Sequence, residues 1–378
     1  MTPNQNVKKS DKKVIGIDYS PFPRPLPSLS FLESIKNATL FLPKKATLAE
    51  QLKLILKLYL NLPRFLNHRV FIFVSPPYFH FGCILILKAL RRRVITVAVD
   101  AYSEIVKEKF WQAPFWKKIV RKMMYPFYLI SETLSIKNSD KVFCVSIYLS
   151  KRYRRLNKNV YYTPNGANVM LISKIRPKKL GKNVIFYMGG FPKWRGVDLL
   201  IKAFELVSRK HDVKLILVGG SKEELHYYPE LKQLLKVKGV IYLGPLSHEK
   251  AISYLKGAKI AVMPNRNTIF SRTISSIKVF EYIAAEVPQV CTDSGEHADW
   301  VKKLNVGIVV KDNVNDIAAG ILKLLDNKKL YDKLKKNCRI RKMKIDYKVL
   351  RKAWFDYLKS IQSEKNSHPT VGNLAPRV

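Results

Sequence analysis

The sequence is poor in acidic residues, in cysteine and in long apolar runs. It has 28 Asp and Glu against 69 Lys and Arg, a formal net charge of +41 over 378 residues. No apolar run reaches the roughly 18 residues that span a bilayer, and the polar, basic start does not resemble a signal peptide. The cysteines show no CxxC or Cys/His ligand spacing, which argues against a disulfide framework or a zinc site; they are Cys83, Cys144, Cys291 and Cys338. We therefore expect a cytoplasmic protein without a metal centre.

The excess of positive charge has several explanations. A field of this sign attracts polyanions but says nothing about the fold. Nucleic acid, an anionic membrane surface and a phosphorylated small molecule are each compatible partners, and a generally lysine-rich composition would also explain the charge. The hydrophobic content of 47% is that of a globular protein able to bury a core.

Short apolar runs alternate with stretches of helical period, such as Leu48–Leu60 and Val197–Ser208. Strands separated by amphipathic helices predict parallel sheets covered on both faces. The number of strands exceeds what one compact domain of this kind usually holds. We predict an α/β protein with two Rossmann-like, doubly wound parallel-sheet domains. The predicted strands are Val14–Ile17, Val70–Val74, Val94–Val99, Val142–Val145, Val184–Met188, Lys214–Val218, Val240–Leu243, Ile260–Met263, Gln289–Thr292 and Gly307–Val310.

The clearest domain boundary is a polar, basic segment between Met170 and Lys182 that lacks periodicity. It predicts an N-terminal domain over residues 14–172 and a C-terminal domain over residues 183–345. A basic extension (1–13) precedes them. Residues 346–361 are expected to form a helix that returns to the N-terminal domain, and residues 362–378 to be a disordered tail.

The first motif is a glycine pair directly after a predicted strand. In FYMGGFPKWRG, Gly189 and Gly190 follow the strand, and Arg195 ends a short loop before an amphipathic helix. Glycines let a backbone approach a ligand closely, and ligands bind at the carboxyl ends of strands in open α/β sheets. The guanidinium of Arg195 suits phosphate oxygens. A simple turn explains the glycines equally well.

The second motif is a helix start at Ser275 and Ser276, followed by Lys278 and Glu281. The serines stand where helix N-caps are preferred, and the N–H groups and positive dipole end of such a helix form an anion site. Lys278 in the first turn opposes the helix dipole, which makes more sense if a phosphate binds there. The carboxylate of Glu281 can accept hydrogen bonds from a ribose diol. A solvated ion pair between Lys278 and Glu281 is the alternative.

Around these motifs the sequence resembles the retaining family 4 (group 1) glycosyltransferases, which have the GT-B fold. The likeness runs from about residue 138 to 361 and includes SDKVFCVSIYLSKRY, with Asp140 and Ser146, the run Pro164-Asn165-Gly166, and Val240–Pro264. It implies two domains that face a cleft, with the donor nucleotide-sugar in the C-terminal domain and the acceptor in the N-terminal one. The resemblance also implies that Gly189 is the loop glycine, that Arg195 binds the donor diphosphate and that Glu281 binds the nucleotide ribose.

The sequence departs from the family pattern at three positions. Gly190 stands where many members carry a second basic residue, and Glu286 replaces a usual glycine. Thr273 stands eight residues before Glu281, where the fuller motif has a sugar-contacting glutamate. Members with a shorter K-x-x-E-Y signature are similar to this sequence. The resemblance therefore implies phosphate and ribose contacts and leaves the sugar contacts unassigned.

The N-terminal domain is expected to hold the acceptor, and Asp100 is the catalytic candidate there. The strand run ITVAVDAYSE ends in Asp100 and Glu104, at the carboxyl end of a predicted parallel strand. Capping of the next helix is the alternative role for Asp100. His80, in SPPYFHFG, is a second candidate, although a lone histidine in a loop is more often structural.

Aromatic and basic residues alternate between Phe110 and Ile130. This mixture suits the interface of an anionic membrane, where each basic residue contributes about 1 kcal/mol. The two prolines are expected to prevent one continuous helix. The alternative is a core-packing helix with basic residues on its solvent side. The candidate membrane-facing residues are Trp111, Trp116, Lys117, Lys118, Arg121 and Lys122.

These observations predict a glycosyltransferase that moves a sugar from a nucleotide-diphosphate donor to a glycan or lipid-linked acceptor, with retention implied by the resemblance. Arg195, Lys278 and the helix start would stabilise the leaving phosphate without a metal or cofactor. The predicted donor-binding residues are Gly189, Gly190, Arg195, Ser275, Ser276, Lys278 and Glu281.

Two other hypotheses stay open. One is a basic nucleic-acid-binding protein, but no known module of that kind is present, so no nucleic acid is expected. The other is a GT-B protein that binds a nucleotide-sugar without catalysis, motivated by Thr273. The expected location is cytoplasmic, with a peripheral position on the inner face of the membrane.

Overall fold

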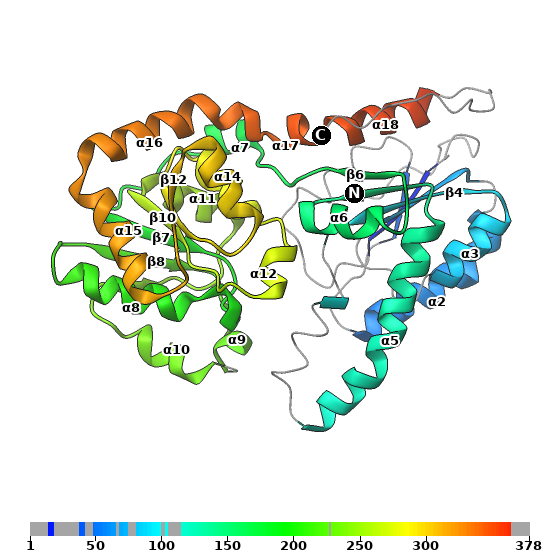
Figure 1. The fold of residues 1–378 in the computed structure, drawn as a ribbon, viewed down its shortest axis with the longest axis horizontal. Helices are drawn as coiled ribbons and strands as arrows, with labels where there is room; N and C mark the ends of the chain where they lie inside the picture. The colour runs from blue at the N-terminus through cyan, green and yellow to red at the C-terminus, as the bar shows by residue number, and fades with distance from the viewer. Residues whose placement is uncertain are drawn as a thin grey trace, which may run out of the picture. The chain divides into compact units, whose positions relative to one another are not determined.

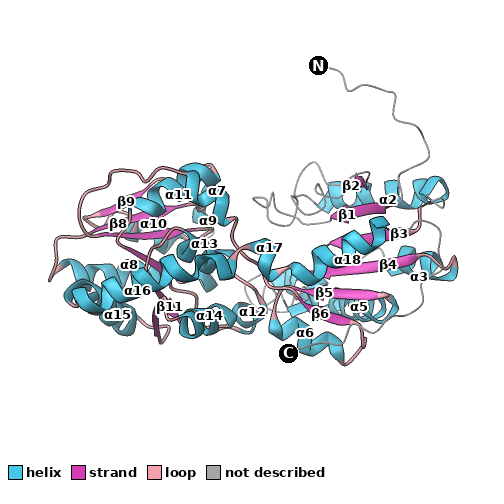
Figure 2. Ribbon diagram, turned by 90° about the horizontal axis from the view of Figure 1, so that it is seen from above, coloured by secondary structure: helices cyan, strands magenta, loops and turns pink. Residues whose placement is uncertain are grey.

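A computed structural model describes residues 14–18, 38–41, 48–65, 68–74, 81–99, 103–104, 115–226 and 228–363. The chain forms two compact units (Figure 1). The N-terminal unit combines Met1–Pro164 with Ala353–Val378, and the C-terminal unit is Asn165–Lys352. Each unit contains one six-stranded parallel sheet (Figure 2). The predicted N-terminal extension and residues 364–378 of the predicted tail lie outside the described residues.

The sheet of the N-terminal unit has the strand order β2-β1-β3-β4-β5-β6. The chain steps from β1 to β2 on one side and then continues from β3 to β6 on the other side of β1, so the order reverses between β1 and β3. The strands are β1 (Val14–Asp18), β2 (Ala38–Phe41), β3 (Val70–Val74), β4 (Arg93–Ala98), β5 (Lys141–Cys144) and β6 (Val160–Tyr162).

The C-terminal helix α18 belongs to the core of this unit. The Trp354 ring packs edge-on against Phe143 of β5, with ring centroids 4.4 Å apart, and Leu358 and Ile361 are buried in the same cluster. The segment at 353–363 therefore completes the N-terminal unit although it follows the other unit in sequence. The helices of this unit are α2 (Leu48–Phe65), α3 (Phe81–Ala89), α5 (Phe115–Asn138), α6 (Ile147–Arg154) and α18 (Lys352–Ser363).

The sheet of the C-terminal unit has the order β12-β11-β10-β7-β8-β9, and here the order reverses between β7 and β10. Alternate residues along its central strands face two separate apolar clusters, as in Phe186 and Met188 against Ile185 and Tyr187. Both faces are therefore covered, as the continuous apolar strands predict. The strands are β7 (Val184–Met188), β8 (Lys214–Val218), β9 (Val240–Tyr242), β10 (Ile260–Met263), β11 (Gln289–Thr292) and β12 (Gly307–Val310).

Helices α7, α11, α13 and α14 pack on one face of this sheet, and α8, α10 and α15 pack on the other. The helical elements of the unit are α7 (Val169–Lys174), the 3₁₀ helix η1 (Lys193–Arg195), α8 (Val197–Ser208), α9 (Lys222–His226), α10 (Pro229–Leu234), α11 (His248–Gly257), α12 (Ile269–Thr273), α13 (Ile277–Ala284), α14 (Glu296–Leu304), α15 (Val314–Asp326), α16 (Lys328–Arg341), the 3₁₀ helix η2 (Lys342–Ile345) and α17 (Tyr347–Leu350).

The strand predictions are confirmed, each to within one residue at either end. Two strands were not predicted. They are β2 (Ala38–Phe41), of four residues, and β6 (Val160–Tyr162), of three.

The prediction that prolines prevent a continuous helix between Phe110 and Ile130 is wrong at Pro126. Helix α5 runs through Pro126 for 24 residues. Pro126 lies on an exposed face of the helix. Water can there satisfy the carbonyl that loses its partner, which lowers the cost of a proline in a helix.

The division between the units falls at Pro164/Asn165, before the expected boundary after residue 172. Asn165 Nδ2 donates to the carbonyl of Ser275 at 2.8 Å, and Arg351 Nη2 donates to Asn165 Oδ1 at 2.6 Å. Ala167 exchanges backbone hydrogen bonds with Ile345 and Tyr347. These bonds to distant segments attach 165–172 to the C-terminal unit, and a sequence pattern does not reveal them.

Candidate functional site

The predicted donor residues lie where the strand order of the C-terminal sheet reverses. The loop with Gly189, Gly190 and Arg195 leaves the carboxyl end of β7, and Asn265 follows β10 on the other side of the reversal. In open α/β sheets this reversal point opens a crevice for ligands. The strand order therefore favours a binding site at this loop, which the glycine motif alone did not establish.

Gly189 stands in a backbone conformation that favours glycine, with φ of +138°. A Cβ at this position would lie 2.9 Å from Lys278 Nζ and 3.3 Å from the Tyr187 hydroxyl. The glycine thus lets the turn after β7 lie directly against the first turn of α13. This contact brings the two sequence motifs together.

Gly190 is required for a different reason, which is space. A Cβ on Gly190 would lie 2.7 Å from Oε1 of Glu224. The other oxygen of Glu224 accepts the N–H groups of Phe191 and Ser221, at 3.2 and 2.9 Å. Glu224 therefore braces this loop, and it occupies the side of Gly190 where a side chain at this position would project.

Arg195 ends η1 with its guanidinium stacked on a neighbouring ring. Its Cζ lies 4.3 Å from the centroid of Trp194, whose ring packs edge-on against Phe270 at 4.8 Å. The buried Nε of Arg195 has no hydrogen-bond partner in the described part of the chain. An arginine oriented by stacking, with free donors, is suited to bind an anion.

Helix α13 begins without a side-chain cap. Ser276 is the N-cap residue, but its side chain makes no capping hydrogen bond. Ser275, the residue before it, is held through its carbonyl by Asn165. The first N–H groups of the helix therefore keep their capacity to bind an anion.

Lys278, in the first turn of α13, is buried with 7% of its surface exposed. Its Nζ donates to the Tyr187 hydroxyl at 3.4 Å and lies 4.6 Å above the Tyr187 ring, and no carboxylate in the described residues forms an ion pair with it. Burial lowers the pKa of Lys278 well below its usual value, the charge of Arg195 lowers it further, and Glu281 acts in the opposite direction. The alternative of a solvated Lys278–Glu281 pair is wrong, because Lys278 is not solvated and Glu281 has another partner.

That partner is His248, the first residue of α11. Its Nε2 lies 2.6 Å from Oε1 of Glu281, and 8% of Glu281 is exposed. The hydrogen bond to Glu281 raises the pKa of His248, while burial acts against this shift. The carboxylate of Glu281 is thus fixed through one oxygen, and its second oxygen remains available to a ligand hydroxyl.

Asn265, His297 and their neighbours were not predicted. Asn265 is fully buried, and neither polar atom of its side chain has a partner among the described residues. Its carbonyl accepts the Thr292 hydroxyl at 2.5 Å. Ser294 Oγ lies 3.1 Å from this hydroxyl and 3.1 Å from Nε2 of His297. Burial, followed by the charge of Lys278, lowers the pKa of His297 to about 4.

The position of Asn265 could have been found from the sequence, because it follows a strand end as the Gly189 loop does. Nothing local marks His248 or His297. Thr273 is buried and donates its hydroxyl to the carbonyl of Phe270 at 2.8 Å. Thr273, where the sequence departs from the family pattern, is therefore the last residue of α12, and its hydroxyl is bonded within that helix.

The candidates of the N-terminal unit are described only in part. Asp100, His80 and Trp111 lie outside the described residues. The backbone of α5 carries the other membrane candidates. Lys122 is exposed, and the side chains not described are those of Trp116, Lys117, Lys118 and Arg121. Glu104 forms an ion pair with Arg152 at 3.0 Å.

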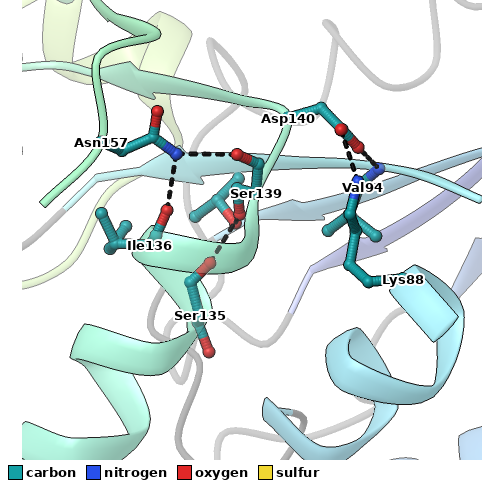
Figure 3. A network of polar contacts seen from close by, with 8 residues as sticks. Lys88, Val94, Ser135, Ile136, Ser139, Asp140 and Asn157 are labelled. Atoms are coloured by element: carbon teal, nitrogen blue, oxygen red, sulfur yellow. Dashed lines mark hydrogen bonds and ion pairs between the residues drawn. The ribbon is translucent and has the colours of Figure 1, made fainter.

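Two residues named for the family resemblance have structural contacts in this unit. Asp140 accepts hydrogen bonds from Lys88 Nζ at 2.5 Å and from the Val94 N–H at 2.7 Å (Figure 3). Beside it, Asn157 Nδ2 donates to two carbonyls at the end of α5 (Figure 3). One belongs to Ile136 in the last turn of the helix, and the other to Ser139, which follows the helix. Ser146 caps α6 by accepting the Leu149 N–H at 3.2 Å. The Asp140 bonds tie α3 to β4, and the Ser146 bond caps α6.

In the described part of the chain, no helix combines the length and the apolar character needed to cross a membrane.

Residues 170–341 match the family described as "Glycosyl transferases group 1". Among curated proteins, the chain is 21% identical over 208 residues to the uncharacterized glycosyltransferase YqgM of Bacillus subtilis, covering 54% of this chain and 56% of the relative. It is 27% identical over 207 residues to the uncharacterized glycosyltransferase MJ1178 of Methanocaldococcus jannaschii, covering 53% and 54%. The chain thus spans about half the length of the curated relatives it matches.

The solved structure of HepE from Anabaena in complex with UDP is similar over 92% of this chain and all of that one, with a TM-score of 0.69 and 16% identity. The glycosyltransferase WaaG, described as involved in lipopolysaccharide biosynthesis, is similar over 93% of this chain, with a TM-score of 0.64 and 15% identity. These similarities show that the fold is GT-B.

Proposed function

We propose that this chain is a glycosyltransferase that moves a sugar from a nucleoside-diphosphate donor to a glycan or lipid-linked acceptor. The observation that carries the proposal is Lys278, a buried lysine with no carboxylate ion pair among the described residues, next to Arg195 and the Gly189 turn. A buried charge without a partner is costly, and a bound diphosphate would supply the missing negative charge. The match of residues 170–341 to group 1 glycosyltransferases supports this assignment.

In this proposal the positive groups act on the leaving phosphate. When the bond between the sugar and the phosphate breaks, negative charge develops on the phosphate oxygen. Lys278, Arg195 and the uncapped N–H groups of α13 are fixed before the reaction, so they stabilise this charge without reorganisation. The scheme assigns no step to a metal or another cofactor.

Glu281 holds the nucleotide through its ribose. His248 occupies one carboxylate oxygen, and the other accepts a ribose hydroxyl. This arrangement orients the carboxylate without using all of its acceptor capacity. Asn265, with a buried and unpartnered amide, is a further candidate for a polar contact to the donor.

The transfer step retains the anomeric configuration in this proposal. The acceptor hydroxyl attacks the anomeric carbon on the face that the phosphate leaves, and a phosphate oxygen takes the proton of that hydroxyl. Asp100 remains the candidate for contact with the acceptor or donor sugar. Analysis of the anomeric configuration of the product by NMR tests retention, and an inverted product contradicts it.

Nucleotide affinity tests the donor site directly, and UDP is a suitable probe because the similar HepE structure contains it. Hydrogen bonds to charged groups contribute about 1.5–3 kcal/mol. Arg195→Ala and Glu281→Ala should therefore each weaken binding roughly 10- to 100-fold while the protein stays folded. Unchanged UDP affinity in both variants would contradict the donor site. A panel of nucleotide-sugars then separates transfer from binding without catalysis.

We also propose that α5 contacts an anionic membrane surface. Four of its exposed apolar residues, Ile119, Met123, Pro126 and Ile130, recur at spacings of four, three and four, which places them on one face of the helix; exposed Leu129 lies outside this spacing. Exposed Lys122 lies beside them, and the one acidic residue of the helix, Glu132, is buried. An apolar stripe with basic neighbours suits an interface with anionic lipid.

Vesicle binding tests this partner. The protein should bind vesicles that contain phosphatidylglycerol, and salt should weaken the binding. Changing Lys117, Lys118, Arg121 and Lys122 to Ser should weaken it further. Tight, salt-dependent binding to DNA or RNA with no binding of nucleotide-sugars would instead support the nucleic-acid hypothesis.

A further inference from the structure

The short helices α7 and α17 of the C-terminal unit begin at the same carboxylate. Asp346 Oδ2 accepts the Val169 N–H of α7 at 3.2 Å, and Oδ1 accepts the Lys348 N–H of α17 at 2.9 Å. The backbone of Ala167 pairs with Ile345 and Tyr347 on either side of Asp346. The first turns of the two helices therefore lie side by side, and Figure 1 shows both along the same edge of the unit as α16.

Large apolar side chains point into solvent on these elements. In α7, Met170 is 60% exposed and Leu171 is 44% exposed. Val349 of α17 is 56% exposed, as is Met343 of η2, and Ile340 at the end of α16 is 60% exposed. Their inward neighbours Ile172 and Ile345 are buried in the core of the unit. The exposed residues therefore do not contribute to that core.

Basic residues are frequent in the segments that carry these apolar side chains, and acidic residues in the same segments are rare; Glu286, from α13, pairs with Lys342 of η2 at 2.6 Å. The sequence has ten Lys and Arg in residues 333–352 and five in residues 168–182. The two ranges together contain one acidic residue, Asp346. Asp346 is buried, and both of its oxygens accept backbone N–H groups. The exposed basic residues nearest in sequence to the apolar ones are Lys174, Arg339, Lys344 and Lys348.

We infer that this surface, defined by Met170, Leu171, Lys174, Arg339, Ile340, Met343, Lys344, Lys348 and Val349 and called here the α7–α17 patch, docks on an anionic lipid bilayer. The positive charge complements anionic headgroups, and the apolar side chains can enter the boundary between headgroups and acyl chains. A nucleic-acid backbone would use the lysines but offers nothing to exposed Met and Val side chains. The combination therefore favours lipid over nucleic acid.

The α7–α17 patch is distinct from the α5 surface. It belongs to the other unit, and it rests on different residues. The inference also does not depend on sugar transfer, because vesicle binding is measured without a nucleotide-sugar. A failure of the patch and a failure of the proposed enzyme activity are therefore distinguishable.

The test uses the full chain and co-sedimentation with vesicles of phosphatidylcholine mixed with phosphatidylglycerol, with pure phosphatidylcholine vesicles as the comparison. One variant removes charge (Lys344→Ser with Lys348→Ser), and a second removes apolar contacts (Met343→Ser with Val349→Ser). The matched control is Lys202→Ser with Lys210→Ser; both lysines are exposed, at α8 and just beyond its end, and α8 covers the opposite face of the sheet. Circular dichroism and thermal unfolding confirm that each variant is folded.

Each lysine near an anionic surface contributes about 1 kcal/mol, which is about fivefold in partitioning. The charge variant should therefore bind anionic vesicles at least tenfold more weakly, the apolar variant severalfold more weakly, and the control like the wild type. Wild-type binding in both patch variants overturns the inference, whether or not changes in α5 abolish binding. The inference is also overturned if the wild type binds RNA, the charge variant loses that binding, and the apolar variant binds vesicles like the wild type.

Discussion

In the N-terminal unit the partly buried charge of Arg152 is neutralised by carboxylates, whereas Lys278 at the candidate site of the C-terminal unit has no ion pair among the described residues. In the N-terminal unit, Arg152 pairs with Glu104 and with buried Glu132, each at 3.0 Å, and donates to Ser103 at 2.9 Å. In the C-terminal unit, Lys278 is more deeply buried than Arg152, and its amino group contacts the Tyr187 hydroxyl and ring without an ion pair among the described residues.

We propose that this difference separates charges with a structural role from charges that bind a ligand. The C-terminal unit also pairs charges away from the site, as in Arg266 with Asp198 and Lys342 with Glu286. The C-terminal unit therefore also neutralises charges by ion pairs outside the candidate site. Lys278 and Arg195 lie at the reversal point of the sheet, and neither has an ion pair among the described residues. Our proposal that they bind a ligand rests on this coincidence.

The largest expected effect on stability comes from breaking the ion pairs of Arg152. Arg152→Ala leaves the carboxylate of Glu132 buried without its cation, and breaking a buried pair in this way costs about 3–5 kcal/mol. We expect this loss in the free energy of unfolding measured with urea. UDP affinity of the folded fraction should be unchanged. A loss of UDP affinity without a loss of stability would reverse the roles assigned to the two units.

A pH dependence comes next in size. The folded-state pKa of His297 is about 4, against an ordinary value of 6.5. The unfolded chain therefore binds a proton below pH 6.5 that the folded chain does not bind, and stability falls as the pH falls from 6.5 towards 4. The loss should approach about 3 kcal/mol. Urea unfolding of wild type and His297→Gln across this range measures it, and parallel pH profiles would contradict the prediction.

For His248 the pH dependence of stability has the opposite sign to that of His297. Its hydrogen bond to Glu281 raises its folded-state pKa above 6.5. The stabilisation is therefore present below pH 6.5 and is lost as the pH rises through the raised pKa. His248→Gln keeps a donor for Glu281 but does not titrate. The stability difference between wild type and His248→Gln should shrink as the pH rises, and a difference independent of pH would show that the pair is absent in solution.

The smallest effect is expected for an exposed pair of the N-terminal unit. The side chains of Lys88 and Asp140 are 32% and 36% exposed, and pairs of this kind contribute about 0–1 kcal/mol. Lys88→Ala should therefore change the unfolding free energy by less than about 1 kcal/mol, because Asp140 keeps the Val94 N–H. Asp140→Ala, which removes both bonds, should cost more, and equal effects would show that Lys88 dominates.

The sequence predicted those features that depend on neighbours along the chain. Strands with continuous apolar runs, the Gly189 turn and the start of α13 were identified because each is local. The helix α5 was misjudged at Pro126, since exposure decides the cost of a proline and exposure is not visible in a pattern.

Contacts between distant segments could not be predicted. His248 lies 33 residues from Glu281, and Asn165 lies 110 residues from Ser275 and 186 from Arg351. No spacing rule connects such positions, and only the order of the strands brings them together. Lys278 shows both cases, because its residue type and position suggested a phosphate while its burial and lack of an ion pair became visible only in the fold.

The central claim is that Lys278 awaits a diphosphate, and proton uptake on binding tests it most directly. Burial lowers the pKa of Lys278, and a bound diphosphate should raise it again, so binding takes up a proton at pH values between these two pKa values. Calorimetric titration of UDP in two buffers of different ionisation enthalpy measures this uptake. We predict proton uptake by the wild type, and roughly 10- to 100-fold weaker binding without uptake by Lys278→Met. Equal affinity and equal proton balance in the two proteins would contradict the account.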